Sequence, residues 1–288
     1  MKIAVILNTR KEDSEFEIEY DPPHTIHLIK HGIEQTGNDY EFIEADENVY
    51  ENLKIVKPDL VFNRAEGIRG ESRESHIPAM LEMLKIPYVG SNVLTTAIGL
   101  NKTWAKKCLA YHKILTPRFI TVSDISEIGN FDLTFPVILK PNEEGSSMGI
   151  NEDNVVFNIE NLKVKLENLL NTYQQSILVE QFIQGREFSV GLLGKAGEDP
   201  EVLSILEIDY STLPKETGNV FGQRAKTIYD SLDHYICPAK ISKDLKKRLQ
   251  ISSINIWKHL DIRDFGRIDF RMNTKNQIYF LEINPLPG

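Results

Sequence analysis

Two runs of alternating apolar and polar residues near the end of the chain constrain its fold most strongly. They are Phe265–Phe270 and Tyr279–Pro285. Such alternation is typical of two paired β-strands, and it places every second side chain on the same face. Four polar side chains would then gather on one side of a hairpin, namely Arg267 and Asp269 from the first strand and Glu282 and Asn284 from the second.

Two carboxylates, a carboxamide and a guanidinium make up this predicted cluster. Carboxylate and carboxamide oxygens are hard ligands that suit Mg²⁺, which usually keeps several waters and binds substrate phosphates as well. The alternative is a solvated sheet face on which cross-strand ion pairs form without a metal. Alternation alone favours the solvated face, whereas the rarer combination of Gly-Arg-x-Asp with Glu-x-Asn-Pro favours a site.

Length and composition describe an ordinary globular protein. The chain has 288 residues, 41% of them hydrophobic and 26% charged, which allows two or three domains. Its formal net charge of -9 argues against a general nucleic-acid-binding surface. Two cysteines far apart in sequence argue against a disulfide scaffold and fit a reducing cytosol. The first apolar run, Ile3–Leu7, is too short for a signal peptide or a membrane span and reads as a buried parallel strand.

The pattern of strands and helices divides the chain into three predicted domains. Residues 1–100 alternate strands with helices, which indicates an open parallel α/β sheet with ligand loops at the carboxyl ends of its strands. Residues 101–184 and 185–288 read as two α+β lobes with mainly antiparallel strands. The last region includes an expected strand at Val202–Ile208 and an expected helix at Lys243–Leu260. The predicted fold class is therefore α/β plus α+β.

Two further segments have features of a nucleotide site. Pro136–Ile150 is an apolar strand that ends at Lys140 and continues into a loop with two glycines and two serines, which could bring backbone N–H groups and a positive charge to a phosphate. Ile177–Val190 leaves a buried strand through Glu180 and turns before Glu187. Its backbone could meet an adenine edge, and Glu187 could accept hydrogen bonds from ribose hydroxyls. A surface hairpin and a charged connector are the alternatives for these segments.

Taken in order, these motifs resemble the ATP-grasp superfamily and, within it, the D-alanine–D-alanine ligase family. The segments that carry the resemblance are Ile86–Ser91, Asn101–Lys106, Lys140–Gly149, Leu178–Glu180, Gly185–Phe188, Gly266–Asp269 and Leu281–Pro285. The resemblance covers nearly the whole chain and implies an ATP-grasp fold behind an N-terminal pre-ATP-grasp domain. It also implies ATP and Mg²⁺ as cofactors, with Mn²⁺ able to replace Mg²⁺, activation of a carboxylate as an acyl phosphate, and attack by an amine.

The resemblance further implies roles for individual residues. Those implied for binding ATP are Lys102, Lys140, Ser146, Ser147, Glu180, Gln181, Ile183 and Glu187. Those implied for the metal are Asp269, Glu282 and Asn284. Those implied for catalysis are Arg267, Lys226 and Ser147. The roles agree with the chemistry, because phosphoryl transfer depends on positioned cations and a metal, and a lid excludes water that would hydrolyse an acyl phosphate.

Three segments depart from the family pattern. Asn8–Ser14 lacks the glycine pair of the family's first-strand loop, Asn63–Gly67 replaces a His-Gly stretch, and Arg69–Ser75 is unlike the usual Gly-Glu-Asp-Gly run. These departures predict a paralogue with a different acid or amine, for which D-alanine alone is a poor substrate. The candidate substrate residues are Glu19 and Asp21 for an ammonium group and Arg69 and Arg73 for a carboxylate. Helix capping and surface charge are equally weighted alternatives for these four residues.

The leading functional hypothesis is a cytoplasmic, ATP-dependent carboxylate–amine ligase. Its expected partners are small-molecule acids and amines, with neither nucleic acid nor membrane, and a homodimer is compatible with the sequence. The alternative is a nucleotide-binding regulatory or assembly module of the same fold that has lost ligation. The intact polar hairpin weighs against this alternative. The altered loops weigh for it, as does the chain end at Pro287-Gly288, where family members continue with a substrate-binding loop and a helix.

Overall fold

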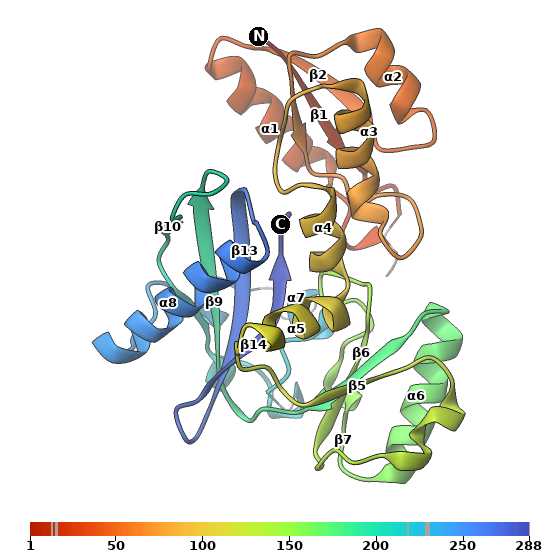
Figure 1. The fold of residues 1–288 in the computed structure, drawn as a ribbon, viewed down its shortest axis with the longest axis vertical. Coiled ribbons are helices and arrows are strands. Elements are labelled where there is room, and N and C mark those ends of the chain that lie inside the picture. Colours follow the sequence, from red (N-terminus) through yellow and green to blue (C-terminus); the bar gives the residue numbers. More distant parts are fainter. Residues whose placement is uncertain (13, 15–16, 218, 228–230, 288) are drawn as a thin grey trace.

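In the part of the chain that the structure describes, three β-sheets with their helices make up the molecule (Figure 1). The structure is a computed structural model and describes residues 1–12, 14, 17–217, 219–227 and 231–287. Asp13 of the first-strand loop and the terminal Gly288 lie outside the described residues. None of the helices in these ranges is long and apolar enough to cross a membrane.

The first sheet is parallel, as its βα pattern predicts, and its strand order is β2-β1-β3-β4. Its elements are β1 (Lys2–Leu7), α1 (Pro23–Gln35), β2 (Asp39–Glu44), α2 (Val49–Val56), β3 (Leu60–Asn63), α3 (His76–Leu84), β4 (Tyr88–Val89) and α4 (Val93–Leu100). Ala4 and Ile6 of β1 are fully buried because Leu53 of α2 and Leu81 of α3 pack in the same apolar cluster. The carboxyl ends of β1 and β3 therefore lie side by side, as in other open parallel sheets.

The second sheet is antiparallel, with strand order β5-β8-β6-β7. It follows α5 (Lys102–Tyr111), and its elements are β5 (Phe119–Val122), β6 (Val137–Pro141), β7 (Val155–Val156), α6 (Ile159–Tyr173) and β8 (Ile177–Gln181). Helix α6 begins after Asn158, whose side chain accepts a hydrogen bond from the backbone of Asn161. Leu162, Leu166 and Leu169 of α6 form one buried face, because residues three and four apart point the same way.

The third sheet is also antiparallel and runs in the order β12-β11-β9-β13-β14, with β10 paired to β9. Its elements are β9 (Gly185–Gly194), β10 (Glu201–Val202), β11 (Leu206–Ile208), α7 (Gln223–Thr227), β12 (Tyr235–Ile236), α8 (Lys243–His259), β13 (Asp264–Asn273) and β14 (Ile278–Asn284). Leu249, Ile256 and Trp257 of α8 are buried in the apolar core beneath this sheet. The single strand expected at Val202–Ile208 is wrong, because β10 and β11 pair with β9 in registers that differ by one residue.

Short 3₁₀ helices complete the described structure. They are η2 (Arg73–Ser75), η3 (Ile125–Asn130), η4 (Glu152–Asn154), η5 (Tyr210–Thr212), η6 (Lys215–Thr217) and η7 (Leu232–His234).

Helix α4 links the first sheet to the end of the third (Figure 1). Its Gly99 lies against Pro285, which follows β14. A Cβ atom at position 99 would come within 2.3 Å of Pro285 Cγ, so a larger residue cannot fit without movement. This close approach places the loops of the first sheet next to the polar hairpin.

Candidate active site

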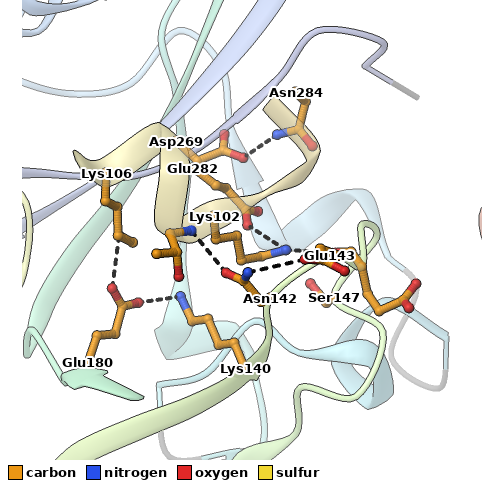
Figure 2. Close-up of polar contacts among 12 residues, drawn as sticks. Lys102, Lys106, Lys140, Asn142, Glu143, Ser147, Glu180, Asp269, Glu282 and Asn284 are labelled. Carbon is orange, nitrogen blue, oxygen red and sulfur yellow. Dashed lines mark hydrogen bonds and ion pairs between the residues drawn. The ribbon is translucent and has the colours of Figure 1, made fainter. Parts of the chain in front are cut away.

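The predicted polar cluster lies on one face of the β13–β14 hairpin (Figure 2). Arg267 pairs with Asn284 and Asp269 with Glu282 in the strand register. Arg267 Nε lies 3.2 Å from Asp269 Oδ1, and Asn284 Nδ2 donates to Asp269 Oδ2 over 3.1 Å. Ser189 of β9 donates to Asp269 Oδ1 over 2.6 Å. The prediction that the four hairpin side chains share a face is confirmed.

The donor atoms of this face suit a hard cation that also binds substrate. Asp269, Glu282 and Asn284 supply two carboxylates and one carboxamide oxygen. Among the described residues there is no group of three or more His, Cys, Asp or Glu side chains that could hold a metal by itself. An ion bound at the hairpin would therefore complete its coordination with waters and phosphate oxygens, which is the usual habit of Mg²⁺.

A buried carboxylate between two lysines lies below the hairpin (Figure 2). Glu180 Oε2 is 2.8 Å from Lys106 Nζ, and Glu180 Oε1 is 2.7 Å from Lys140 Nζ. Burial by itself raises the pKa of Glu180, but the two ammonium groups outweigh burial and lower that pKa to about 2. Burial lowers the pKa of Lys106, whereas Glu180 raises the pKa of Lys140 above its ordinary value despite burial. The cluster therefore fixes Lys140 as a cation at the end of β6.

A first cavity lies between the second and third sheets. Residues predicted to bind nucleotide or metal form much of its lining: Lys140, Ser147, Glu180, Gln181, Ile183, Glu187, Asp269 and Glu282. Its volume of ≈ 60 Å³ is well below the roughly 300–1,000 Å³ of ordinary ligand pockets. A nucleotide could enter only if the loops over this cavity moved apart.

The ribose candidate Glu187 is held by two neighbours. Tyr210 Oη donates to Glu187 Oε2 over 2.6 Å, and Arg271 Nε donates to the same oxygen over 2.9 Å. Arg271 also donates from Nη1 to the carbonyl of Ile183 over 3.0 Å, and its guanidinium lies 4.7 Å from the centre of the Phe182 ring. Arg271 therefore joins β13 to the segment that connects the second sheet to the third.

The lid candidates lie in the loop after β6. Ser146 and Ser147 both have left-handed backbones, with φ of 46° and 62°, and Ser147 Oγ donates to the carbonyl of Phe221 over 3.3 Å. Lys226 of α7 has its Nζ 6.0 Å from the centre of the Phe221 ring. Burial lowers the pKa of Lys226, although Glu282 opposes that shift. The two loops thus meet at the first cavity, which Ser147 and Phe221 both line.

A second cavity, of ≈ 270 Å³, lies farther along the hairpin, toward the end of β14. Its lining includes the charged and polar residues Glu19, Glu66, Glu74, Lys102, Lys226, Arg267, Glu282 and Asn284. Lys102 Nζ lies 4.0 Å from Glu282 Oε2 and also donates to the carbonyl of Glu144. Glu282 lines both cavities.

The four predicted substrate residues are placed differently from one another. Glu19 lines the second cavity. Arg73 instead ties loops together, because it lies 2.8 Å from Glu19 and 3.0 Å from Glu144. Asp21 is paired with Arg64 at 3.0 Å. Arg69 is exposed and is not among the described residues that line either cavity. The geometry therefore supports a direct substrate contact for Glu19 and structural contacts for Asp21 and Arg73.

Comparisons with known proteins agree with this arrangement. The family model described as "D-ala D-ala ligase C-terminus" matches residues 107–288. The D-alanine–D-alanine ligase of Aquifex aeolicus is 31% identical over 294 residues, which cover 100% of this chain and 91% of the relative. The chain belongs to the D-alanine–D-alanine ligase family.

Solved structures show the same fold. A D-alanine–D-alanine ligase from Bacillus anthracis complexed with ATP has a TM-score of 0.74 at 23% identity and covers 100% of this chain and 87% of its own. The VanG D-Ala:D-Ser ligase from Enterococcus faecalis has a TM-score of 0.73 at 23% identity, with 100% and 90% coverage. The predicted ATP-grasp fold of this family member is confirmed. The protein is an enzyme, an ATP-dependent ligase that joins a carboxylate to an amine on small-molecule substrates.

Several residues of this ligase site were missed by reasoning from sequence. Lys106 lies one helical turn after Lys102 on α5, so the shared helix face was a usable signal. Arg271 continues the alternation of Arg267 and Asp269 along β13. Tyr210 has no such local signal, because its hydroxyl reaches Glu187 from η5, 23 residues along the chain.

Proposed function

We propose that ATP and the carboxylate substrate of this ligase meet at the β13–β14 hairpin. The observation that supports this proposal is that Glu282 lines both cavities, with Asp269 on the first and Arg267 and Asn284 on the second. A nucleotide in the first cavity would then direct its phosphates toward a carboxylate in the second. Lys102, 4.0 Å from Glu282, would neutralise phosphate charge at this junction.

The proposed reaction has two steps. A carboxylate oxygen attacks the γ-phosphorus of ATP, the bond to the β-phosphate oxygen breaks, and ADP leaves from an acyl phosphate. The amine nitrogen then attacks the acyl carbon, the bond to the phosphate oxygen breaks, and the proton lost by the amine leaves with phosphate. Arg267 and Lys226 would stabilise the negative charge that spreads over the transferring phosphoryl group, and Ser147 would donate a hydrogen bond from the lid.

The nucleotide contacts follow from the first cavity. Lys140, oriented by Glu180, would bind phosphate, and the loop with Ser146 and Ser147 would close over it. The backbone of Gln181 and Ile183 would meet the adenine edge, and Glu187 would accept hydrogen bonds from the ribose hydroxyls. In the structure Glu180 is 1% exposed and its carboxylate lies between two lysines. We therefore propose that Glu180 acts at the adenine end chiefly by positioning Lys140.

Mg²⁺, with Mn²⁺ as a substitute, is the proposed metal, held by Asp269, Glu282 and Asn284. It would neutralise charge on the β- and γ-phosphates.

We further propose a cytoplasmic location, because Cys108 and Cys237 are both free thiols.

A homodimer is proposed as the oligomeric state. The side chains of Leu94, Trp104 and Tyr111 are 67%, 57% and 84% exposed on α4 and α5, and a second copy of the chain would cover such an apolar surface. Sedimentation velocity tests this proposal, because a monomer at micromolar concentration would contradict it.

Nucleotide binding gives the first test of the proposed function. ATP with Mg²⁺ should raise the melting temperature, because a ligand that binds only the folded state stabilises it. Lys140→Ala should remove most of the increase, since the proposed phosphate contact is lost. Lys195→Ala serves as the control, because Lys195 is an exposed residue just after β9. An unchanged melting temperature across millimolar ATP would exclude the nucleotide site.

Turnover gives the second test. ADP and phosphate release should be stimulated by an acid and an amine other than D-alanine alone. Glu282→Gln keeps the shape of the side chain but removes its charge, so turnover should fall at least ~100-fold while the fold and melting temperature are retained. Arg267→Ala should lower kcat more than it raises KM, because its charge is needed most as the transition state forms. Near-normal turnover of Glu282→Gln with the best substrate would refute the hairpin mechanism.

A further inference from the structure

We propose that one substrate of this ligase is an amino acid with a cationic side chain, and that Glu66 and Glu74 bind its side-chain ammonium group. The proposal rests on the proposed function, since it assigns the substrate class of the second cavity. Both carboxylates line that cavity together with Glu19.

Glu74 is the clearest sign that a cation is bound here. It is only 7% exposed, yet it lines the cavity, and its carboxylate has neither a hydrogen bond nor an ion pair with any residue that the structure describes. Buried carboxylates in folded proteins are normally paired or hydrogen-bonded. A bound ammonium group would supply the missing partner.

The cations near Glu74 are already shared among other carboxylates. Arg73 contacts both Glu19 and Glu144, at 2.8 and 3.0 Å. Arg64 is paired with Asp21 at 3.0 Å. Under the proposed function, the remaining cations of the cavity face the phosphates. The carboxyl groups of Glu66 and Glu74 are therefore left for the substrate.

The pKa shifts of Glu66 and Glu74 agree with the binding of a cation between them. Burial and the neighbouring Glu19 raise the pKa of Glu74 to about 8. Burial and Glu74 raise the pKa of Glu66. Arg73 and Lys102 reduce the shift at Glu74 without removing it. Each carboxylate is thus costly to ionise in the free enzyme, and a ligand cation placed between them would favour the ionised forms.

The backbone holds Glu66 in place before any ligand arrives. Asn8 Oδ1 accepts hydrogen bonds from the backbone N–H groups of Glu66 and Gly67, over 2.9 and 3.1 Å. Asn8 is itself buried and donates to the carbonyl of Ala45 over 3.0 Å. Gly67 has φ of +82°, and a Cβ atom there would come within 2.4 Å of the carbonyl oxygen of Arg73. These contacts favour a single conformation of the loop after β3, as a preorganised binding loop requires.

Matched pairs of amino acids test the proposal. ADP release would be measured with lysine and norleucine, ornithine and norvaline, and diaminobutyrate and 2-aminobutyrate, as both enantiomers and in pairwise combination with other amino acids. The members of a pair have side chains of equal carbon count and differ by one ammonium group. We expect kcat/KM for the best cationic member to exceed that of its neutral partner at least ~10-fold. The neutral partner would leave the carboxylates of Glu66 and Glu74 without a partner.

Isosteric variants then assign the preference to residues. Glu66→Gln and Glu74→Gln should reduce the cationic preference at least ~10-fold, chiefly through KM, while the neutral partner loses little. Glu71→Gln is the control, because Glu71 is exposed and lies on the same loop without lining the second cavity. If the carboxylates instead acted as protonated donors to a substrate oxygen, the variants would affect both members of a pair equally, and the proposal would be overturned.

Binding separates this proposal from the proposed function. Calorimetry with the cationic amino acids, with and without a non-hydrolysable ATP analogue, reports on the cavity even if no turnover is seen. ADP release with neutral amino acids alone would overturn the substrate class and leave the ligase mechanism standing. Binding of cationic amino acids that Glu74→Gln abolishes, without ADP release from any pair, would support the substrate class and overturn the ligase mechanism. Absence of selective binding would overturn the substrate class.

Discussion

At the scale of single residues, Glu180 is a buried charge that positions a second charged group. Its carboxylate is 1% exposed, and Lys106 beside it is fully buried. Desolvation removes most of the net contribution that a buried ion pair makes to stability. The role of such a pair is therefore better sought in the group that it positions. Here Glu180 places the ammonium group of Lys140 at the edge of the first cavity.

The lowered pKa of Glu180 predicts a dependence of stability on pH. Its pKa is 4.5 unfolded and about 2 folded, so the folded state holds the proton less tightly. The resulting stability is fully present above pH 4.5 and is lost as the pH falls through about 2. The shift corresponds to about 3 kcal/mol in the free energy of unfolding.

Glu180→Gln tests this prediction in urea denaturation at several pH values. The variant should be less stable than the wild type at pH 7, because Lys106 loses its buried partner. The difference between the two proteins should narrow steadily from pH 5 toward pH 2. A difference that stays constant over this range would show that folding does not lower the pKa of Glu180.

At the scale of elements, sequence patterns predicted the structure correctly where one face of a strand or helix is buried and the other is not. The alternation of Arg267, Asp269 and Glu282 predicts the hairpin face correctly, since the pleat fixes the period of side chains. The edge strand β2 was missed because Ile43 is its one buried residue, so it has no apolar alternation to detect. Helix α4 was missed because it is mostly apolar and its polar residues Thr95 and Thr96 are buried, which leaves little amphipathic contrast.

Contact between elements predicts an effect of substitution at Gly99. Gly99→Ala would place a methyl carbon 2.3 Å from Pro285 Cγ, so α4 must move away from the end of β14. We expect a loss of about 1–3 kcal/mol in the free energy of unfolding, as for other overpacked contacts, and weaker binding in the second cavity, which Gly99 lines.

Gly32→Ala is the matched control, because a Cβ atom at Gly32 in α1 meets no atom within 4 Å. That substitution should stabilise the helix slightly, by roughly 0.5–1 kcal/mol. Equal effects of the two substitutions in chemical denaturation would mean that the contact between α4 and Pro285 is not maintained in solution.

At the scale of the whole molecule, the site is assembled from segments that sequence reasoning could identify only one at a time. The second sheet supplies Lys140, the third supplies Glu282, and the loop after β3 of the first sheet supplies Glu66. The family motifs locate the nucleotide half, because each motif carries its own strand and loop. The acidic end of the second cavity depends on how loops after β1 and β3 fold together, and no local pattern gives the burial or the pairing of Glu74.

This assembly predicts that the two halves of the site respond to different ligands. Hydrogen exchange should slow in residues 140–149 and 265–284 when a non-hydrolysable ATP analogue with Mg²⁺ is added, because these segments line the first cavity or close over it. Residues 63–75 should be protected only when a cationic amino acid is added as well, since they border the acidic end of the second cavity. Lys140→Ala should abolish the first response, and Glu74→Gln should abolish the second while leaving the first intact. Protection of residues 63–75 by nucleotide alone would contradict the division of the site at the hairpin, because it would place the phosphate groups, and not a substrate cation, beside Glu66 and Glu74.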